Sequence, residues 1–180
     1  MPGHRAMSVT AFDYDGDGDD DLYVSNDGTP NLLFQNDGHG RFTEVALKAG
    51  VGFNQFGAAD GSMGAAVADA TGDGLPDIFV TRFGNASFYV NSRGGLFDDR
   101  IQPSGLHALT SPYTGWGGNF LDVENDGDLD LFIVNGNAHF LEGMPPLLLE
   151  NRGDGTFVDG AAKGGPLFKA ALNGRGSAAW

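Results

Sequence analysis

The sequence predicts an all-β fold made of about three four-stranded antiparallel repeats of ~55 residues, the size of a β-propeller blade. Glycine supplies 30 of the 180 residues, a density typical of many short strands and turns. An acidic nine-residue window also recurs three times, and its first residues, Asp13, Asp69 and Asp122, are 56 and 53 residues apart. Each copy is followed by a hairpin, which a parallel β-helix would lack, so the repeats indicate propeller blades.

Each unit is expected to open with two strands joined by the acidic window. The first strand is small or apolar in all three units and covers residues 6–12, 62–68 and 115–121. The second strand follows the window directly, is apolar, and covers residues 22–26, 78–83 and 131–136. Because the window reverses the chain between two strands, each pair is predicted to be antiparallel.

A second hairpin completes each unit, within residues 31–45, 86–100 and 146–160. Its turn starts at Asn36, Asn91 and Asn151 and closes at Gly40, Gly95 and Gly155, which are residues typical of turns. Phenylalanine follows two residues later, at positions 42, 97 and 157, as an anchor that packs one sheet on the next.

These units predict one partial, open propeller over residues 1–180. We place the repeats at approximately 6–60, 61–112 and 113–172, with residues 173–180 as the first strand of a truncated fourth unit. Three blades do not close a ring, so the outer faces of the first and last blades are expected to expose apolar surface. Self-association through these faces, or further sequence, would cover them.

The acidic windows have the chemistry of a calcium site. In the first, Asp13, Asp15, Asp17 and Asp21 fall at positions 1, 3, 5 and 9, with glycines interleaved. Alternate residues can point to one centre, and glycine permits the positive-φ turns that wrap backbone around an ion. All the ligands are hard oxygens, which suit calcium, whereas zinc and copper prefer ligands that this loop lacks. We therefore expect about three calcium ions, one for each loop.

The first window also matches the start of an EF-hand loop, but two features reject that assignment. An EF-hand requires a bidentate glutamate at position 12, where this sequence has Val24. An EF-hand also continues into a helix, whereas the residues after this window are typical of a strand.

The loop D-x-D-G-D-G-x-x-D, its apolar strand and the later N-x-G-x-G-x-F resemble the FG-GAP repeat, which is integrin-α-like and also known as VCBS. The third unit and the final "GRGSAAW" resemble ASPIC/UnbV-type proteins in particular. The resemblance covers essentially the whole chain and implies calcium-binding propeller blades from a secreted or cell-envelope protein. Propellers of this family have about seven blades, and the C-terminal domain of the ASPIC/UnbV group is missing here, so we expect a fragment of a larger protein.

The resemblance implies a metal-binding set in each loop. In loop one it comprises Asp13, Asp15, Asp17, Asp21 and the carbonyl of Asp19. In loop two it comprises Asp69, Thr71, Asp73, Asp77 and the carbonyl of Leu75. In loop three it comprises Asp122, Glu124, Asp126, Asp130 and the carbonyl of Asp128, with Asn125 as a further variant. Because ligand charge tunes calcium affinity, loop one is expected to bind tightest and loop two weakest.

Composition limits the partners. The net charge is −14, which argues against nucleic acid, and 14 of the 24 acidic residues lie in the three windows. No apolar run approaches the ~18 residues of a membrane span, and residues 1–13 have no apolar core of signal-peptide length. The chain has no cysteine, so its redox compartment cannot be inferred. The assignment to an extracellular or envelope location therefore rests on the resemblance.

The leading functional hypothesis is a non-enzymatic recognition module that binds protein or glycan. The four histidines show no catalytic spacing and no nucleophile-elbow motif is present. There are two alternatives. The chain could belong to a carbohydrate-active enzyme, namely a polysaccharide lyase or hydrolase, or it could be a fragment without independent activity. Contacts with a ligand are expected from the non-repeated segments 101–118 and 136–146, where Tyr113, Trp116, His139 and Phe140 form a candidate rim. Trp116 also aligns with Met7 and Met63, which favours a core position.

Overall fold

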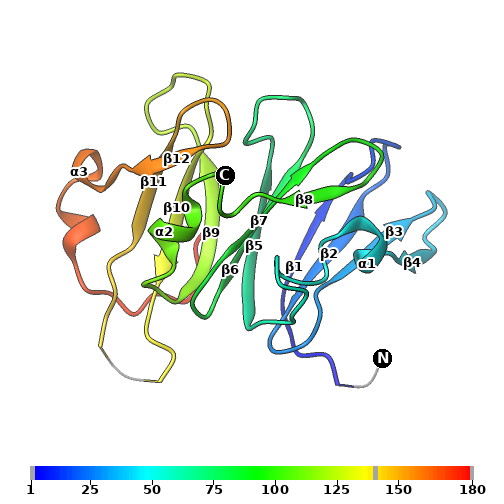
Figure 1. Cartoon of the computed structure of the whole chain (residues 1–180), viewed down its shortest axis with the longest axis horizontal. Coiled ribbons are helices and arrows are strands. Elements are labelled where there is room, and N and C mark those ends of the chain that lie inside the picture. The colour runs from blue at the N-terminus through cyan, green and yellow to red at the C-terminus, as the bar shows by residue number, and fades with distance from the viewer. Residues whose placement is uncertain (1–2, 140–141, 179–180) are drawn as a thin grey trace.

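The computed structural model describes residues 3–139 and 142–178 and contains three four-stranded antiparallel sheets side by side (Figure 1). The first sheet has the order β1-β2-β3-β4 and its strands are Ala6–Phe12, Asp21–Asn26, Leu32–Asn36 and Phe42–Glu44. The second sheet consists of β5 (Ser62–Ala68), β6 (Asp77–Arg82), β7 (Ser87–Asn91) and β8 (Phe97–Asp99). The third consists of β9 (Gly115–Leu121), β10 (Asp130–Asn135), β11 (Leu147–Asn151) and β12 (Phe157–Asp159). The predicted all-β fold of propeller blades is therefore confirmed, and the sheets do not close into a ring.

Among the described residues, short helices lie only in the connections after each sheet. They are α1 (Ala46–Ala49), α2 (Leu106–Thr110), α3 (Ala161–Gly164) and the 3-10 helix η1 (Pro166–Lys169). The longest helix of the described residues, α2, has five residues, and no described helix is long and apolar enough to cross a bilayer.

Each interface between neighbouring sheets has its own hydrophobic core. Between the first two sheets, Tyr23 and Leu33 pack against Ile78, Val80 and Tyr89. Between the second and third, the core is formed by residues that are almost fully buried: Phe79, Phe88, Leu106, Leu131, Ile133 and Leu149. The connections contribute to these cores, because Val51 lies in the first and Leu106 in the second. The innermost strands β1, β5 and β9 lie side by side, as expected for blades that share an axis.

Two of the three turn asparagines form hydrogen bonds between sheets. Asn91 Nδ2 donates to the carbonyl of Tyr14 at 3.0 Å, and Asn151 Nδ2 donates to the carbonyl of Ala70 at 2.8 Å. In both cases the acceptor is the second residue of the acidic loop in the preceding sheet. Asn36 belongs to the first sheet, and its Nδ2 donates instead to Asp20 of its own sheet. Asn91 and Asn151 therefore hold neighbouring sheets together in addition to shaping the turns.

The turn phenylalanines also differ between the first sheet and the two later sheets. Phe97 stacks near Tyr14 and is 7% exposed, and Phe157 meets Phe88 edge-on and is 4% exposed. Phe42 is 46% exposed because the first sheet packs on no earlier one among the described residues. The predicted role of phenylalanine as an anchor between sheets is thus observed at the two interfaces that exist here.

The glycines that close these turns allow a matched test of the interface. Gly155 and Gly40 have φ values of +74° and +81°, so alanine adds similar backbone strain at either position. A Cβ at Gly155 would lie 2.8 Å from Thr71 Cγ2 of the preceding sheet, whereas a Cβ at Gly40 would meet nothing within 4 Å. We expect Gly155→Ala to lower the free energy of unfolding by about 1–3 kcal/mol more than Gly40→Ala does, because it overpacks the interface. Urea denaturation measures both variants, and equal losses would contradict the interface argument.

The C-terminal segment lies along the third sheet. Gly174 N donates to the carbonyl of Asn135, and Asn119 Nδ2 donates to Ser177 Oγ. Residues 173–178 form no strand, so their assignment, with residues 179–180, to a fourth unit stays a prediction. Phe168 of η1 meets Phe132 of β10 edge-on and covers part of the outer face of this sheet.

Candidate metal centre

Each acidic window forms a loop between the first two strands of its sheet, and left-handed residues give the loop its curvature. Gly16 and Gly18 have φ values of +82° and +92°, and Gly72 and Gly74 repeat this pattern in the second loop at +73° and +86°. In the third loop Asn125 takes the first of these positions at φ +58°, and Gly127 takes the second. Asparagine tolerates this region better than most residues, so the departure from glycine preserves the loop.

The first aspartate of each loop binds the loop's own backbone. Asp13 Oδ2 accepts a hydrogen bond from Gly18 N at 2.9 Å, Asp69 Oδ2 from Gly74 N at 2.7 Å, and Asp122 Oδ2 from Gly127 N at 3.0 Å. The fifth residue also accepts in each loop, since Asp17, Asp73 and Asp126 each take a hydrogen bond from the N–H two residues later. The three loops therefore share one construction, and the sequence differences between them lie in the remaining positions.

The ninth residue of each loop is a buried aspartate that joins the loop to the following hairpin. Asp21 Oδ2 accepts from Tyr14 N and its Oδ1 from Asn36 N. Asp77 accepts from Ala70 N and Asn91 N in the same way, and Asp130 accepts from Val123 N and Asn151 N. All three carboxylates are at most 2% exposed.

Burial raises the pKa of Asp21 and raises that of Asp77 to about 6, although their backbone hydrogen bonds act in the opposite direction. Neighbouring loop carboxylates raise both values further. A cation in the loop would reverse this effect and keep the carboxylates ionised.

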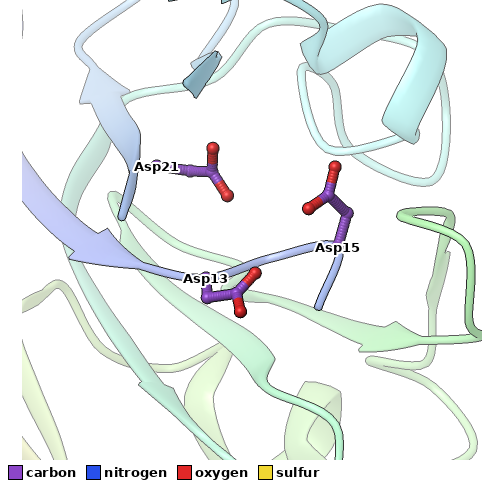
Figure 2. Close-up of side chains that lie close together, drawn as sticks. All are labelled: Asp13, Asp15 and Asp21. Atoms are coloured by element: carbon purple, nitrogen blue, oxygen red, sulfur yellow. The ribbon is translucent and has the colours of Figure 1, made fainter. Parts of the chain in front are cut away.

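In the first loop, Asp13, Asp15 and Asp21 offer carboxylate oxygens that lie within 4.8 Å of one another, and Figure 2 shows the three groups facing a common space. Asp15 Oδ2 accepts from Gln35 Nε2 at 2.6 Å, while its Oδ1 is buried without a hydrogen-bond partner. A buried unpartnered carboxylate oxygen is costly unless a cation binds it. These oxygens are therefore suited to a divalent ion that prefers hard oxygen ligands. Asp17 was also predicted as a ligand, but its carboxylate does not belong to this cluster.

The second loop has a similar unpartnered oxygen at the same position. Thr71, at position 3, has a buried Oγ1 without a hydrogen-bond partner. Asp69 and Asp73 lie on the loop and Asp77 at its end, so this loop presents three carboxylates and one neutral oxygen. The same position thus carries an unsatisfied oxygen in two loops of different sequence.

The third loop differs because a lysine reaches it. Lys163 of α3 lies 3.5 Å from Glu124 Oε1 and 2.6 Å from Glu150 Oε2. A side-chain hydrogen bond with Asp130 raises the pKa of Glu124, while the lysine acts in the opposite direction. Glu124 at position 3 is therefore already close to a cation supplied by the chain, which the sequence alone did not indicate because the lysine is 39 residues away.

The seventh residue contacts the turn of its own sheet. Cβ atoms built at Gly38 and Gly153 would strike the carboxylates of Asp19 and Asp128, respectively. In the second sheet the corresponding residues are Leu75 and Arg93, and Arg93 adopts φ +65°, which is uncommon for a residue other than glycine. Glycine in the turn therefore accompanies aspartate at position 7, although the two residues are 19 positions apart in the first sheet and 25 apart in the third.

Of the candidate rim, the three described residues Tyr113, Trp116 and His139 lie in different surroundings. Tyr113 packs against the second hydrophobic core, and Trp116 lies under Arg175 and donates from Nε1 to the carbonyl of Gly136. Trp116 also lines a pocket with Met7 and Met63, the residues with which it aligns in the sequence. His139 is exposed and meets Phe83 edge-on, and Phe140 lies outside the described residues.

The comparison with protein-family models agrees with the repeats described above. The family model for FG-GAP-like repeats matches residues 13–80 and 69–133, a span that covers all three acidic loops. A search of the curated proteins found no match. Among solved structures, three chains match, including an Agrocybe aegerita lectin described as recognising non-reducing terminal N-acetylglucosamine. The chain is 22% identical to that lectin with a TM-score of 0.46, over 83% of this chain and 36% of the lectin chain.

Proposed function

The chain belongs to the FG-GAP-like repeat family, and from that membership we propose that it is a calcium-stabilised propeller segment with a non-catalytic role in recognition. One calcium ion binds each acidic loop and offsets the mutual repulsion of its carboxylates. The module binds protein or glycan as part of a larger secreted or cell-envelope protein, where calcium is plentiful. We also propose that this larger protein is of the ASPIC/UnbV type.

The observation that carries the proposal is the unpartnered oxygen at position 3 of two loops. Asp15 Oδ1 and Thr71 Oγ1 are buried without partners, although the surrounding backbone groups are hydrogen-bonded. Solvated acidic turns would leave such oxygens in water rather than inside the loop. The metal-binding residues are those implied by the sequence: Asp13, Asp15, Asp17, Asp21 and the Asp19 carbonyl in loop one, with the corresponding sets in loops two and three.

A matched pair of variants tests this assignment. Asp15→Asn and Asp20→Asn each remove one negative charge from loop one, but only Asp15 is a proposed ligand, and Asp20 is exposed. We expect calorimetry to find three calcium ions for each chain. Asp15→Asn should weaken one site by about tenfold or more, because ligand charge sets calcium affinity. Asp20→Asn should stay within about twofold of the natural chain. Equal effects of the two substitutions would mean that only the net charge of the loop matters.

The raised pKa of Asp77 predicts a pH-dependent second site. Its pKa is about 6 without calcium, so below that pH a proton competes with the ion for this carboxylate. Calcium binding near pH 5.5 is therefore expected to release protons, and binding at pH 8 is expected to release none. Asp77→Asn should lower the release at pH 5.5 by a fraction of a proton, as measured by calorimetry in two buffers of different ionisation enthalpy. Proton release that does not change in this variant would contradict the assignment of Asp77.

Calcium binding at the second site is favoured by high pH, whereas the stability of the calcium-free chain should fall as the pH rises. A carboxyl whose folded pKa lies above its unfolded value of 3.8 favours the folded state at low pH. The contribution of Asp77 to stability is therefore full below about pH 4 and is lost as the pH rises through about 6. Denaturation of the calcium-free chain between pH 4 and 7 measures it, with Asp77→Asn as the reference without this titration.

A further inference from the structure

A second candidate site lies at the opposite end of the sheets from the acidic loops. It is a pocket of about 120 Å³ between the connection that follows the first sheet and the β6–β7 turn. The residues used in the argument are Asn54, Phe56, Asp60, Arg82, Phe83 and Asp99. Because β5 leads into the second acidic loop and β6 leaves it, the far end of β6 and the start of β5 lie away from the proposed calcium ions.

One residue that lines the pocket is a buried arginine with an unpartnered donor. The Arg82 side chain is 1% exposed. Its Nη1 donates to Asp60 Oδ2 at 2.6 Å and its Nη2 donates to Tyr89 Oη at 2.8 Å. Its Nε is buried and has no hydrogen-bond partner. A buried N–H on a guanidinium is costly to leave unpaired, so this atom is suited to an acceptor from a ligand.

The same pocket offers acceptors. Asp60 is about one-third exposed at its side chain and also accepts from Asn54 Nδ2. Asp99 accepts from Ile101 N, and burial raises its pKa, which indicates that its carboxylate gains from further hydrogen-bond donors. Two carboxylates and one guanidinium give these three groups a net charge of −1, which disfavours an anionic ligand.

Two exposed aromatic rings also line the pocket. Phe56 is 78% exposed and Phe83 is also exposed, although both line the pocket. Phe83 meets His139 edge-on, so one residue of the rim predicted from the sequence adjoins this pocket. Exposed rings beside a small polar pocket provide apolar contact on one side of a ligand and hydrogen bonds on the other.

We infer that this pocket binds one neutral pyranose unit of a glycan, an inference that rests on the proposed recognition function. A pyranose presents hydroxyl groups that donate to Asp60 and Asp99 and accept from Arg82 Nε. Its ring also presents an apolar face of C–H groups that packs on Phe56 or Phe83. A pocket of about 120 Å³ admits the edge of one sugar ring and leaves the rest of the chain in solvent. An organic cation would also meet rings and carboxylates, but it offers no hydrogen-bond acceptor and would leave Arg82 Nε unpaired.

The test uses the chain and two matched variants, loaded with calcium for the saccharide and cation titrations and freed of calcium for the calcium titration. Phe56→Ala and Leu47→Ala each remove an exposed apolar side chain, 78% and 77% exposed, but Leu47 lies on α1 and does not line the pocket. The chain is applied to an array of neutral and acidic oligosaccharides, and the best monosaccharide is then titrated by NMR. Tetramethylammonium chloride is titrated as the cationic probe, and calcium is titrated on calcium-free samples of the same chains.

We expect binding of a neutral saccharide that Phe56→Ala weakens by about tenfold, the loss of one aromatic contact, and that Leu47→Ala leaves unchanged. The inference is overturned if no neutral saccharide binds, if tetramethylammonium or acidic glycans bind more tightly, or if Phe56→Ala has no effect on saccharide binding. If calcium still binds at three sites in that case, the calcium-stabilised module stands and only the pyranose assignment fails. If calcium does not bind, the proposed function itself fails.

Discussion

Removal of calcium is expected to lower the melting temperature of the chain by roughly 15–30 °C. An ion present at 100 times its dissociation constant adds about 2.7 kcal/mol to the free energy of unfolding if the unfolded chain does not bind it. Three such sites add about 8 kcal/mol, and each 1 kcal/mol shifts the melting temperature of a chain of this size by about 2–4 °C. This sum is comparable to the whole stability of an ordinary domain.

The structure explains why the effect reaches beyond the loops. Asp77 connects its loop to the next hairpin through Asn91 N, and the side chain of Asn91 donates to the preceding loop. Asp130 and Asn151 repeat this connection one sheet further on. An ion that fixes one loop therefore also supports the contact between two sheets.

Calorimetry in calcium and in EGTA measures this change, with excess magnesium as the control. Magnesium demands octahedral geometry and gives up water reluctantly, so it should restore only a small part of the loss. A melting temperature that EGTA leaves within a few degrees would show that the loops are solvated acidic turns. Full rescue by magnesium would show that charge neutralisation alone is sufficient.

The strands could be predicted from the sequence because each is bounded by residues with strong local preferences. The first strands expected at 6–12, 62–68 and 115–121 coincide with β1, β5 and β9, since an aspartate loop ends each of them. The short helices were not predicted because four or five residues are too few to show a helical period. The helices α1 and α2 form where the connections pack on the next sheet, as the buried Ala46 and Leu106 show, and that is tertiary information.

The proposed metal ligands were predicted from spacing in loop one and from the family resemblance in the other two loops, whereas most of their surroundings were not predicted. Asp21 was predicted as a ligand, but its bond to Asn36 N depends on how the hairpin folds back on the loop. Lys163 near Glu124 and the pocket around Arg82 join segments that are distant in the sequence. Local patterns report the conformation of a loop, and they do not report which side chain from another segment will face it.

The turn asparagines allow the contact between sheets to be measured at single positions. Asn151→Ala is expected to lower the free energy of unfolding by about 2–4 kcal/mol. The substitution removes the hydrogen bonds from Nδ2 to the carbonyls of Ala70 and Leu129. It also removes those that Oδ1 accepts from Gly153 N and Gly155 N. The Ala70 carbonyl, in a residue that is 2% exposed, would lose the partner that crosses the interface.

Asn36→Ala provides the internal control, because the same residue starts the same turn in a sheet that has no earlier neighbour among the described residues. Its side chain donates to the carbonyl of Asp20 at an exposed position and accepts from Gly38 N, so we expect a loss of about 1 kcal/mol. Urea denaturation in saturating calcium measures both variants together with Asn91→Ala, which should match Asn151→Ala. If all three substitutions lower the free energy of unfolding equally, asparagine stabilises only the turn. If Asn91→Ala and Asn151→Ala lower it more than Asn36→Ala does, the difference measures the hydrogen bond to the neighbouring sheet.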